Sequence, residues 1–129
     1  MWPFGRDKPL GPKGEDLARR ALRKRGMKIL ARNYRCPAGE IDLIALDPST
    51  RKDLGCETIA FVEVKTRSSD RYTDPEAAVN ADKQRRIRKV ADYYLARHDA
   101  ADLAVRFDIV SVLIRAGEKP QIKHLPQAF

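Results

Sequence analysis

Hydrophobic positions along the chain switch between helical and strand spacing. From Leu17 onward, apolar residues recur at i, i+1, i+4 and i+5. This spacing predicts an amphipathic helix that starts near Gly14 and ends at Gly26. Three strands are expected next, at residues 27–32, 40–46 and 58–66. Residues 47–57 are polar and rich in turn formers, so they predict a connection between two antiparallel strands.

The second half of the chain repeats the order of helix and then strand. Asp74 and Pro75 match an N-cap residue followed by a proline in the first helical turn, and Asn80 offers a second cap for a long helix. Two further strands are expected, at residues 106–114 and 121–125. The order αβββαβ, with the last strand added, predicts an α/β sandwich whose central mixed sheet is flanked by helices. We expect an irregular N-terminal arm at residues 1–13 and a single domain at residues 14–129.

Composition indicates a globular chain with a strongly charged surface. The 129 residues suffice for one domain, and 43% of them are hydrophobic against 34% charged. No apolar run reaches the roughly 18 residues of a membrane span. Because the first residues also lack a secretory signal pattern, we expect a cytoplasmic protein without membrane contact. The two isolated cysteines indicate no zinc site. The formal charge of +8 favours a polyanionic partner, and nucleic acid is preferred over anionic lipid.

Charged residues interrupt two of the expected strands between apolar neighbours. With a period of two, Phe61, Glu63 and Lys65 share one face of their strand. In the preceding strand, Asp42 stands between isoleucine and leucine. Buried charges are costly unless they are paired or bind a metal, so these residues predict a functional site. Glu15, at the head of the apolar stripe of the first helix, is placed to reach the same corner.

The residue types of this cluster suit the hydrolysis of a phosphodiester bond. Asp42, Glu63 and Glu15 provide the oxygen ligands that Mg²⁺ prefers. Lys65 can orient an attacking water and offset charge on the phosphate. The simpler interpretation is an ordinary ion pair on a solvated sheet face, because a lone Glu-x-Lys pattern is common by chance. The aspartate in the preceding strand and the apolar flanks favour the site.

Basic residues that follow the third expected strand are candidates for contact with nucleic acid. For Lys83 and Gln84, a position near the site competes with a simple surface position. The others are expected either to face phosphate without reading sequence or to belong to exposed polar surface. The candidates are Arg67, Arg71, Lys83, Gln84, Arg85, Arg86, Arg88 and Lys89. Asp108 is expected to pair with an arginine such as Arg106 and is not assigned to the site.

Several of these residues belong to a combination of motifs that resembles one known family. The motifs are Gly11-x-x-Gly14-Glu15, Gly39-Glu-Ile-Asp42-Leu-Ile-Ala, Phe61-Val-Glu63-Val-Lys65-x-Arg67, Lys83 and Arg106-Phe-Asp108. Together they resemble the bacterial YraN-like family of uncharacterised proteins. That family is similar to archaeal Holliday-junction resolvases and, by resemblance, belongs to the PD-(D/E)XK nuclease superfamily.

The resemblance implies a restriction-endonuclease-like fold, a DNA substrate, either branched or duplex, and Mg²⁺ or Mn²⁺ as cofactor. Carried over by position, it makes Asp42 and Glu63 the metal ligands and Lys65 the catalytic lysine. Glu15 matches the helical acid of the resolvase-like branch. Residues 47–57 are longer than is usual for the family, which implies an altered hairpin.

We therefore expect a metal-dependent endonuclease that cuts DNA, either selectively for structure or without specificity, since no base-reading motif is present. Two alternatives stay open. One is a non-catalytic nucleic-acid-binding protein that retains the nuclease fold, and the other is an enzyme that cleaves RNA with the same acids. A homodimer would suit the symmetric cutting of two strands, but the sequence carries no direct signal for it.

Overall fold

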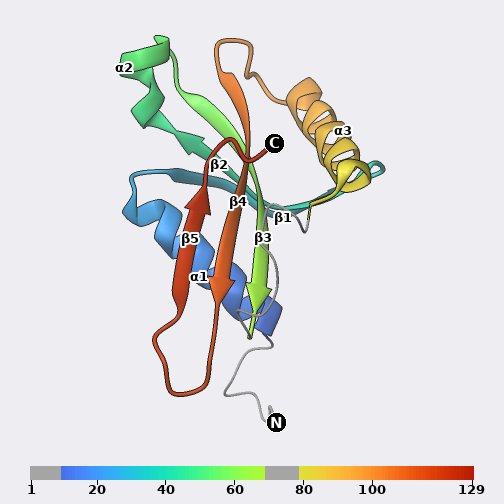
Figure 1. The fold of residues 1–129 in the computed structure, drawn as a ribbon. Helices are drawn as coiled ribbons and strands as arrows, with labels where there is room; N and C mark the ends of the chain where they lie inside the picture. Colours follow the sequence, from blue (N-terminus) through green and yellow to red (C-terminus); the bar gives the residue numbers. More distant parts are fainter. Residues whose placement is uncertain (1–9, 69–78) are drawn as a thin grey trace.

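A five-stranded mixed sheet lies between two helices in the computed structural model, which describes residues 10–68 and 79–129 (Figure 1). The strand order is β1-β2-β3-β4-β5, with β3 and β4 parallel and the other neighbours antiparallel. The strands are β1 (Lys28–Cys36), β2 (Gly39–Asp47), β3 (Thr58–Arg67), β4 (Ala104–Leu113) and β5 (Gln121–Leu125). The helices are α1 (Leu10–Lys24), η2 (Pro48–Thr50), α2 (Arg51–Leu54) and α3 (Ala81–Arg97). The predicted α/β class and mixed sheet are therefore confirmed.

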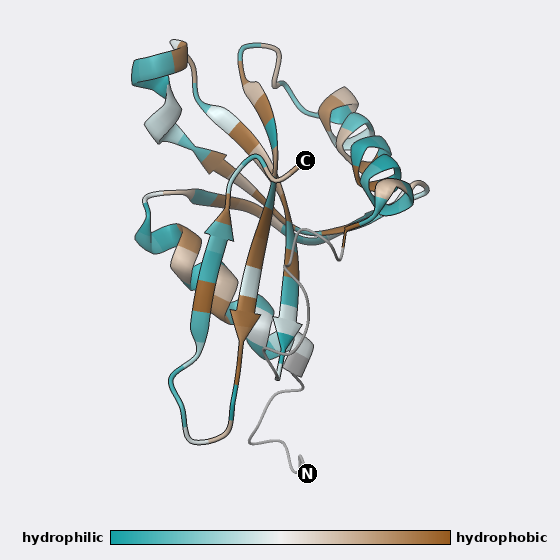
Figure 2. Cartoon of the chain, viewed as in Figure 1, coloured by the Kyte–Doolittle hydropathy of each residue, from teal (hydrophilic) through white to brown (hydrophobic). Residues whose placement is uncertain are grey.

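The two faces of the sheet form separate hydrophobic cores. On one face, Leu22 of α1 packs with Val62 and Val110 of the central strands. On the other, Tyr94 of α3 packs with Phe61, and their rings meet edge-on at a centroid distance of 5.9 Å. Burial of β3 on both faces explains its nearly continuous apolar sequence. Figure 2 shows this hydrophobic band on the central strands and hydrophilic residues over much of α1, α2 and α3.

Two predicted boundaries differ from the structure, and a third prediction is not tested by it. The first helix begins at Leu10, so residues 10–13 are helical and do not belong to an irregular arm. Pro12 is tolerated there because the first turn of a helix has backbone N–H groups without an intrahelical partner. The first strand extends to Cys36. The predicted cap at Asp74 and Pro75 lies outside the described residues.

The polar connection between β2 and β3 contains helical turns that its composition did not predict. The side chain of Asp47 accepts a hydrogen bond from the backbone N–H of Ser49 and caps η2. Gly55 ends α2 with a φ of 76°, a left-handed conformation that suits glycine. The two strands that flank this connection are antiparallel, as predicted.

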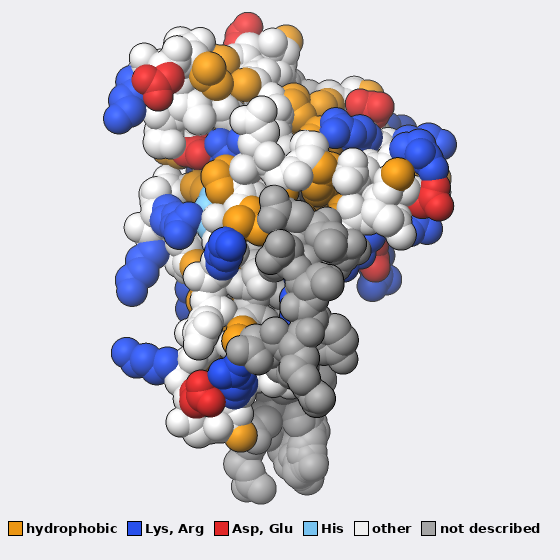
Figure 3. Space-filling model, in the orientation of Figure 1, with side chains coloured by type: hydrophobic (Ala, Val, Ile, Leu, Met, Phe, Trp, Pro, Cys, Tyr) orange, Lys and Arg blue, Asp and Glu red, His pale blue; other side chains and the backbone are white. Residues whose placement is uncertain are grey.

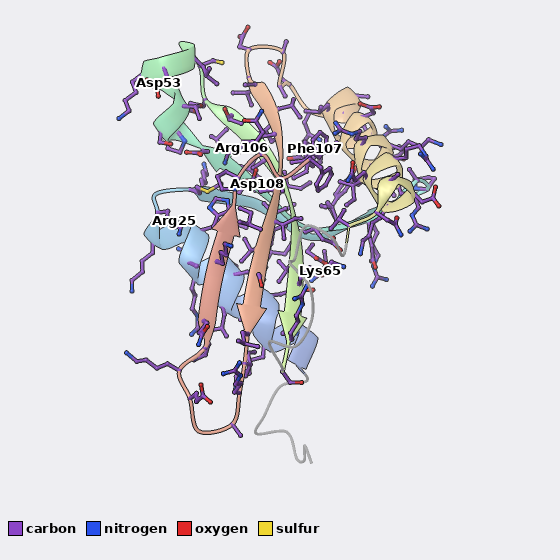
Figure 4. The ribbon with its side chains drawn as sticks, viewed as in Figure 1. Arg25, Asp53, Lys65, Arg106, Phe107 and Asp108 are labelled. Carbon is purple, nitrogen blue, oxygen red and sulfur yellow. The ribbon has the colours of Figure 1, made fainter. Side chains whose placement is uncertain are left out.

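A buried charge cluster joins β4 to its neighbours. Arg106 forms ion pairs with Asp108, at 2.8 Å, and with Asp47, at 2.9 Å. Nε2 of His124 in β5 lies 2.9 Å from Asp108, which is fully buried. The expected pairing of Asp108 with Arg106 is thus confirmed, and the cluster fixes β5 and the start of η2 against β4. Figure 4 shows Arg106 and Asp108 apart from Lys65 along the sheet.

Within the described ranges, no helix combines the length and the apolar character needed to cross a membrane.

Candidate active site

The candidate site lies where β2 and β3 stop pairing. Their antiparallel ladder ends at Leu43 and Val62, although both strands continue. Beyond this fork, β3 remains paired with β4, so only the edge that faced β2 is released. The backbone N–H of Val64 donates a hydrogen bond of 2.7 Å to Oδ2 of Asp42. The carboxylate of Asp42 therefore replaces a backbone partner at the fork.

Asp42 and Glu63 come together at this point. Glu63 is buried, with 6% of the residue exposed, and its carboxyl group lies within hydrogen-bonding reach of Asp42. Burial and the negative charge of Glu63 raise the pKa of Asp42 to about 7, against the opposing hydrogen bond from Val64. Glu15 contributes a further, smaller increase. Such an acid pair holds a proton near neutral pH and favours a bound cation.

Two lysines contact the same oxygen of Glu63. Nζ of Lys65 lies 3.3 Å from Oε2 of Glu63, and Nζ of Lys83 forms a closer ion pair with it. Burial, together with the neighbouring Lys83, lowers the pKa of Lys65. Burial would also lower the pKa of Lys83, but its contact with Glu63 outweighs this effect and raises it. Lys83 is thus the fixed cation, and Lys65 is the amine that gives up a proton more readily.

The position of Lys83 follows from the start of α3. Asn80 is the N-cap, and its side-chain oxygen accepts a hydrogen bond of 2.9 Å from the backbone N–H of Lys83. Ile87 is buried one turn later, so this side of α3 faces the sheet. Of the two interpretations of Lys83 left open by the sequence, the structure shows contact with Glu63.

The N-terminal half of α1 passes unusually close to β3. A Cβ atom added to Gly14 would lie 1.9 Å from Oγ1 of Thr66, so this crossing requires glycine. The crossing brings Glu15 near enough for its charge to raise the pKa of Asp42. Glu15 nevertheless lines a separate groove, with Asn33 among its other residues. Among the acidic, histidine and cysteine side chains that the structure describes, no three gather into a metal-binding group.

A cleft of about 420 Å³ opens beside the acid pair. Its lining residues are Gly39, Glu40, Asp42, Glu63, Val64, Lys83, Arg86 and Ile87. Mg²⁺ commonly binds through one or two carboxylates and keeps several waters, so Asp42 and Glu63 are a sufficient protein ligand set for it. The lysines that now neutralise Glu63 show that this position favours positive charge. The two carboxylates therefore fit a hydrated divalent ion, and Glu15, the third expected ligand, lines the neighbouring groove.

The basic candidates on α3 occupy different environments. Arg86 lines the cleft. Arg85 is paired with Asp82 on the surface, and the side-chain amide of Gln84 donates to the carbonyl of Val79. The guanidinium of Arg88 lies over the ring of Phe107, at 4.6 Å from its centroid. Figure 3 shows Lys and Arg side chains gathered over α3.

The remaining candidates are spread between the helix and the end of β3. Lys89 is exposed on α3, and Arg67 is half-buried at the end of β3. Arg71 lies outside the described residues.

The backbone N–H of Val64 and the close crossing at Gly14 were not predicted as parts of the site. Periodicity cannot reveal either, because a strand pattern does not show where a ladder ends.

Comparison with known proteins identifies the family. The model of the uncharacterised protein family UPF0102 matches residues 14–112. A UPF0102 protein of Geobacter metallireducens is 46% identical over 123 residues, which cover 95% of this chain and 93% of the relative. One of Nocardia farcinica is 46% identical over 125 residues, covering 97% and 92%. One of Solibacter usitatus is 49% identical over 118 residues, covering 90% and 82%. The chain belongs to the UPF0102 family, and the YraN-like resemblance is thereby confirmed.

Proposed function

We propose that this protein is a metal-dependent nuclease that hydrolyses phosphodiester bonds in DNA, either selectively for branched structures or without specificity. The observation that carries the proposal is the buried approach of Asp42 and Glu63 at the fork between β2 and β3, with Lys65 at 3.3 Å from Glu63. We further propose that the mixed sheet between α1 and α3 is a restriction-endonuclease-like fold of the PD-(D/E)XK type. The order of elements and the location of the acids in adjacent strands support this assignment.

In this proposal, each residue of the site has a separate role. Asp42 and Glu63 would hold a hydrated Mg²⁺ or Mn²⁺, which supplies charge neutralisation and acidifies water for attack on the phosphate. Lys65 orients that water and opposes the charge that develops on the phosphate. Lys83 holds the carboxylate of Glu63 in place from α3. Glu15 adds negative charge from the α1 side.

Cleavage assays with purified protein test this proposal. Labelled four-way junction, flap, single-stranded and duplex DNA are incubated with Mg²⁺ or Mn²⁺, with a chelator as the negative control. We expect cutting of at least one substrate and its loss in Glu63→Gln and Lys65→Met. Asp53→Asn is the matched control, because Asp53 lies on the exposed helix α2, far from Lys65 (Figure 4).

A protein that cuts none of these substrates, or one whose cutting survives Glu63→Gln, would refute the nuclease proposal. RNA versions of the same oligonucleotides separate a ribonuclease from a deoxyribonuclease. Sedimentation with and without junction DNA tests for the homodimer that symmetric cutting of two strands would suit.

One observation favours a non-catalytic nucleic-acid-binding protein as the second candidate. Lys65 and Lys83 both pair with Oε2 of Glu63, so this carboxylate has cationic partners without a metal. This candidate predicts DNA binding that weakens with salt and is indifferent both to chelator and to Glu63→Gln.

A further inference from the structure

A second hollow, of about 580 Å³, lies between α1 and β1, away from the α3 side of the sheet. The residues that line it are Arg19, Arg23, Met27, Lys28, Ile29 and Arg32. Four of these six residues are cations, and Met27 and Ile29 pack with the core under α1. We call this hollow the α1–β1 groove. It is separate from the cleft beside the acid pair.

Helical spacing and a bulge in β1 bring these cations together. Arg19 and Arg23 are four residues apart in α1, so they lie on one side of the helix. The register of β1 against β2 shifts between Ile29 and Ala31. After this bulge, Arg32 stands opposite Leu43, whose side chain belongs to the core under α1. Regular alternation from Ile29 would have turned Arg32 to the α3 face, so the bulge directs it into the groove.

The cations of the groove have few acidic partners. Nη2 of Arg19 lies 3.5 Å from Oδ1 of Asp16. The Nε atom of Arg19 is buried and has no hydrogen-bond partner among the described residues. Within residues 10–68 and 79–129, no carboxylate forms an ion pair with Arg23, Lys28 or Arg32. Buried polar groups normally have a partner, and clustered like charges repel one another. Both features indicate a site for an anionic group.

The groove continues towards the acid pair. A smaller hollow, of about 320 Å³, shares Arg19 and Arg32 with it and is also lined by Pro12, Glu15, Asp16, Asn33 and Leu43. Leu43 is adjacent to Asp42 in β2, at the point where the fork begins. The row of cations thus leads from the C-terminal half of α1 to the α1 side of the candidate site.

We propose that the α1–β1 groove binds the phosphodiester backbone of the nucleic-acid strand that is cut, at phosphates away from the scissile bond, with Arg19 and Arg32 as the central contacts. This inference rests on the proposed nuclease function and adds a substrate-binding subsite to it. The ligand is a chain of phosphates, because four cations line this hollow and two of them, Arg19 and Arg32, also line the adjoining hollow that leads towards the site. A lipid surface fits less well, since the cations line a concave groove with its apolar residues at the bottom.

Binding measurements in chelator test the groove without any cutting. The anisotropy of fluorescein-labelled duplex and single-stranded DNA is followed with the full chain over a series of salt concentrations. We expect Arg19→Gln and Arg32→Gln each to weaken binding about 5- to 10-fold and to reduce the slope of log K against log salt by about one. Arg20→Gln is the matched control, because Arg20 is an exposed arginine on the same helix that does not line the groove. It should change binding by less than about 2-fold.

Arg32→Gln and Arg23→Gln guard against effects on folding, because both residues are exposed whereas Arg19 is partly buried. Equal losses in Arg20→Gln and the groove variants would overturn the proposal, since they would reflect net charge alone. Unchanged DNA binding by the groove variants would also overturn it. So would a result in which these variants lose binding only to vesicles that contain anionic lipid. DNA binding through Arg19 and Arg32 by a protein that cuts nothing would support the groove but refute the nuclease. Normal cutting and binding in the groove variants would refute the groove alone.

Discussion

Replacing Asp42 with asparagine should stabilise the metal-free protein while abolishing cleavage. The substitution keeps the size of the side chain and its oxygen, which can still accept the hydrogen bond from the Val64 N–H. The new amide N–H can donate a hydrogen bond to the carboxylate of Glu63. In the wild type, two acidic side chains face each other at this point. The variant therefore removes charge repulsion without removing the contact that holds the fork.

The magnitude follows from the pKa of Asp42, which rises from 3.8 to about 7 on folding. A group whose pKa is higher in the folded state contributes its full stabilisation at pH values below its pKa in the unfolded chain. This contribution is lost as the pH rises through its pKa in the folded protein. At about 1.4 kcal/mol for each pH unit, ionised Asp42 costs the folded state up to about 4 kcal/mol above pH 7. Since Lys65 and Lys83 relieve part of the repulsion from Glu63, we expect a gain of about 1–3 kcal/mol for Asp42→Asn at about pH 8.

Urea unfolding in chelator, from about pH 4 to pH 8, measures this difference. The gain should be smallest at pH 4 and largest at pH 8, and Asp53→Asn on α2 should show no such trend. Added Mg²⁺ should then raise the stability of the wild type, by about 2.7 kcal/mol at a hundred times its dissociation constant, but not that of Asp42→Asn. A variant that is less stable at pH 8, or equally shifted at both pH values, would refute the reasoning.

Three other substitutions probe the supporting structure. Gly14→Ala should lower the free energy of unfolding by about 1–3 kcal/mol because its Cβ clashes with Thr66, and Thr66→Ala should restore part of the loss in urea unfolding. Asp108→Asn should cost about 3 kcal/mol near pH 7, because Arg106 loses a buried partner. Burial alone would raise the pKa of Asp108, but hydrogen bonds from His124 and Arg106 outweigh burial and hold this pKa below 3.8. The stabilisation by ionised Asp108 is therefore lost in acid, and the difference in stability between the variant and the wild type should shrink there. Lys83→Gln should slow cleavage about 10- to 100-fold and move the acidic limb of the pH–rate profile to higher pH, because Asp42 loses a neighbouring cation.

The sequence predicted the main elements because their hydrophobic periods are clear. The helical stripe around Leu22 and the apolar run of β3 both belong to the cores that the structure shows. The sequence also indicated that Asp42, Glu63 and Lys65 converge, because buried charges on adjacent strands are costly without partners. The register that places both acids at one point is not encoded in the periodicity. The contact between Lys83 and Glu63 was one of two open interpretations.

Other features depend on backbone details that composition does not encode. The polar residues of η2 and α2 satisfy the rules for turns as well as those for short helices, and only the cap at Asp47 and the left-handed Gly55 distinguish them. Arg88 belongs to a basic run in the sequence, but it lies over Phe107, a residue distant in the chain. Glu15 was correctly placed near Asp42, but the helical pattern could not show that it opens onto a different groove.

Both proposed sites arise where the sheet departs from regular pairing. A regular ladder would satisfy the N–H of Val64 with backbone from β2 and would leave Asp42 without that hydrogen bond. Regular alternation in β1 would also direct Arg32 away from α1. Arg32 and Leu43 are register partners, so the β1 bulge and the β2–β3 fork lie on neighbouring strands within a few residues of one another. A strand of nucleic acid held along α1 would therefore approach the acid pair from the side on which Glu15 lies, while α3 closes the opposite side with Lys83. Cations from two helices would then flank the same phosphodiester backbone, with Asp42 and Glu63 between them and the acids Glu15 and Asp16 on the α1 side.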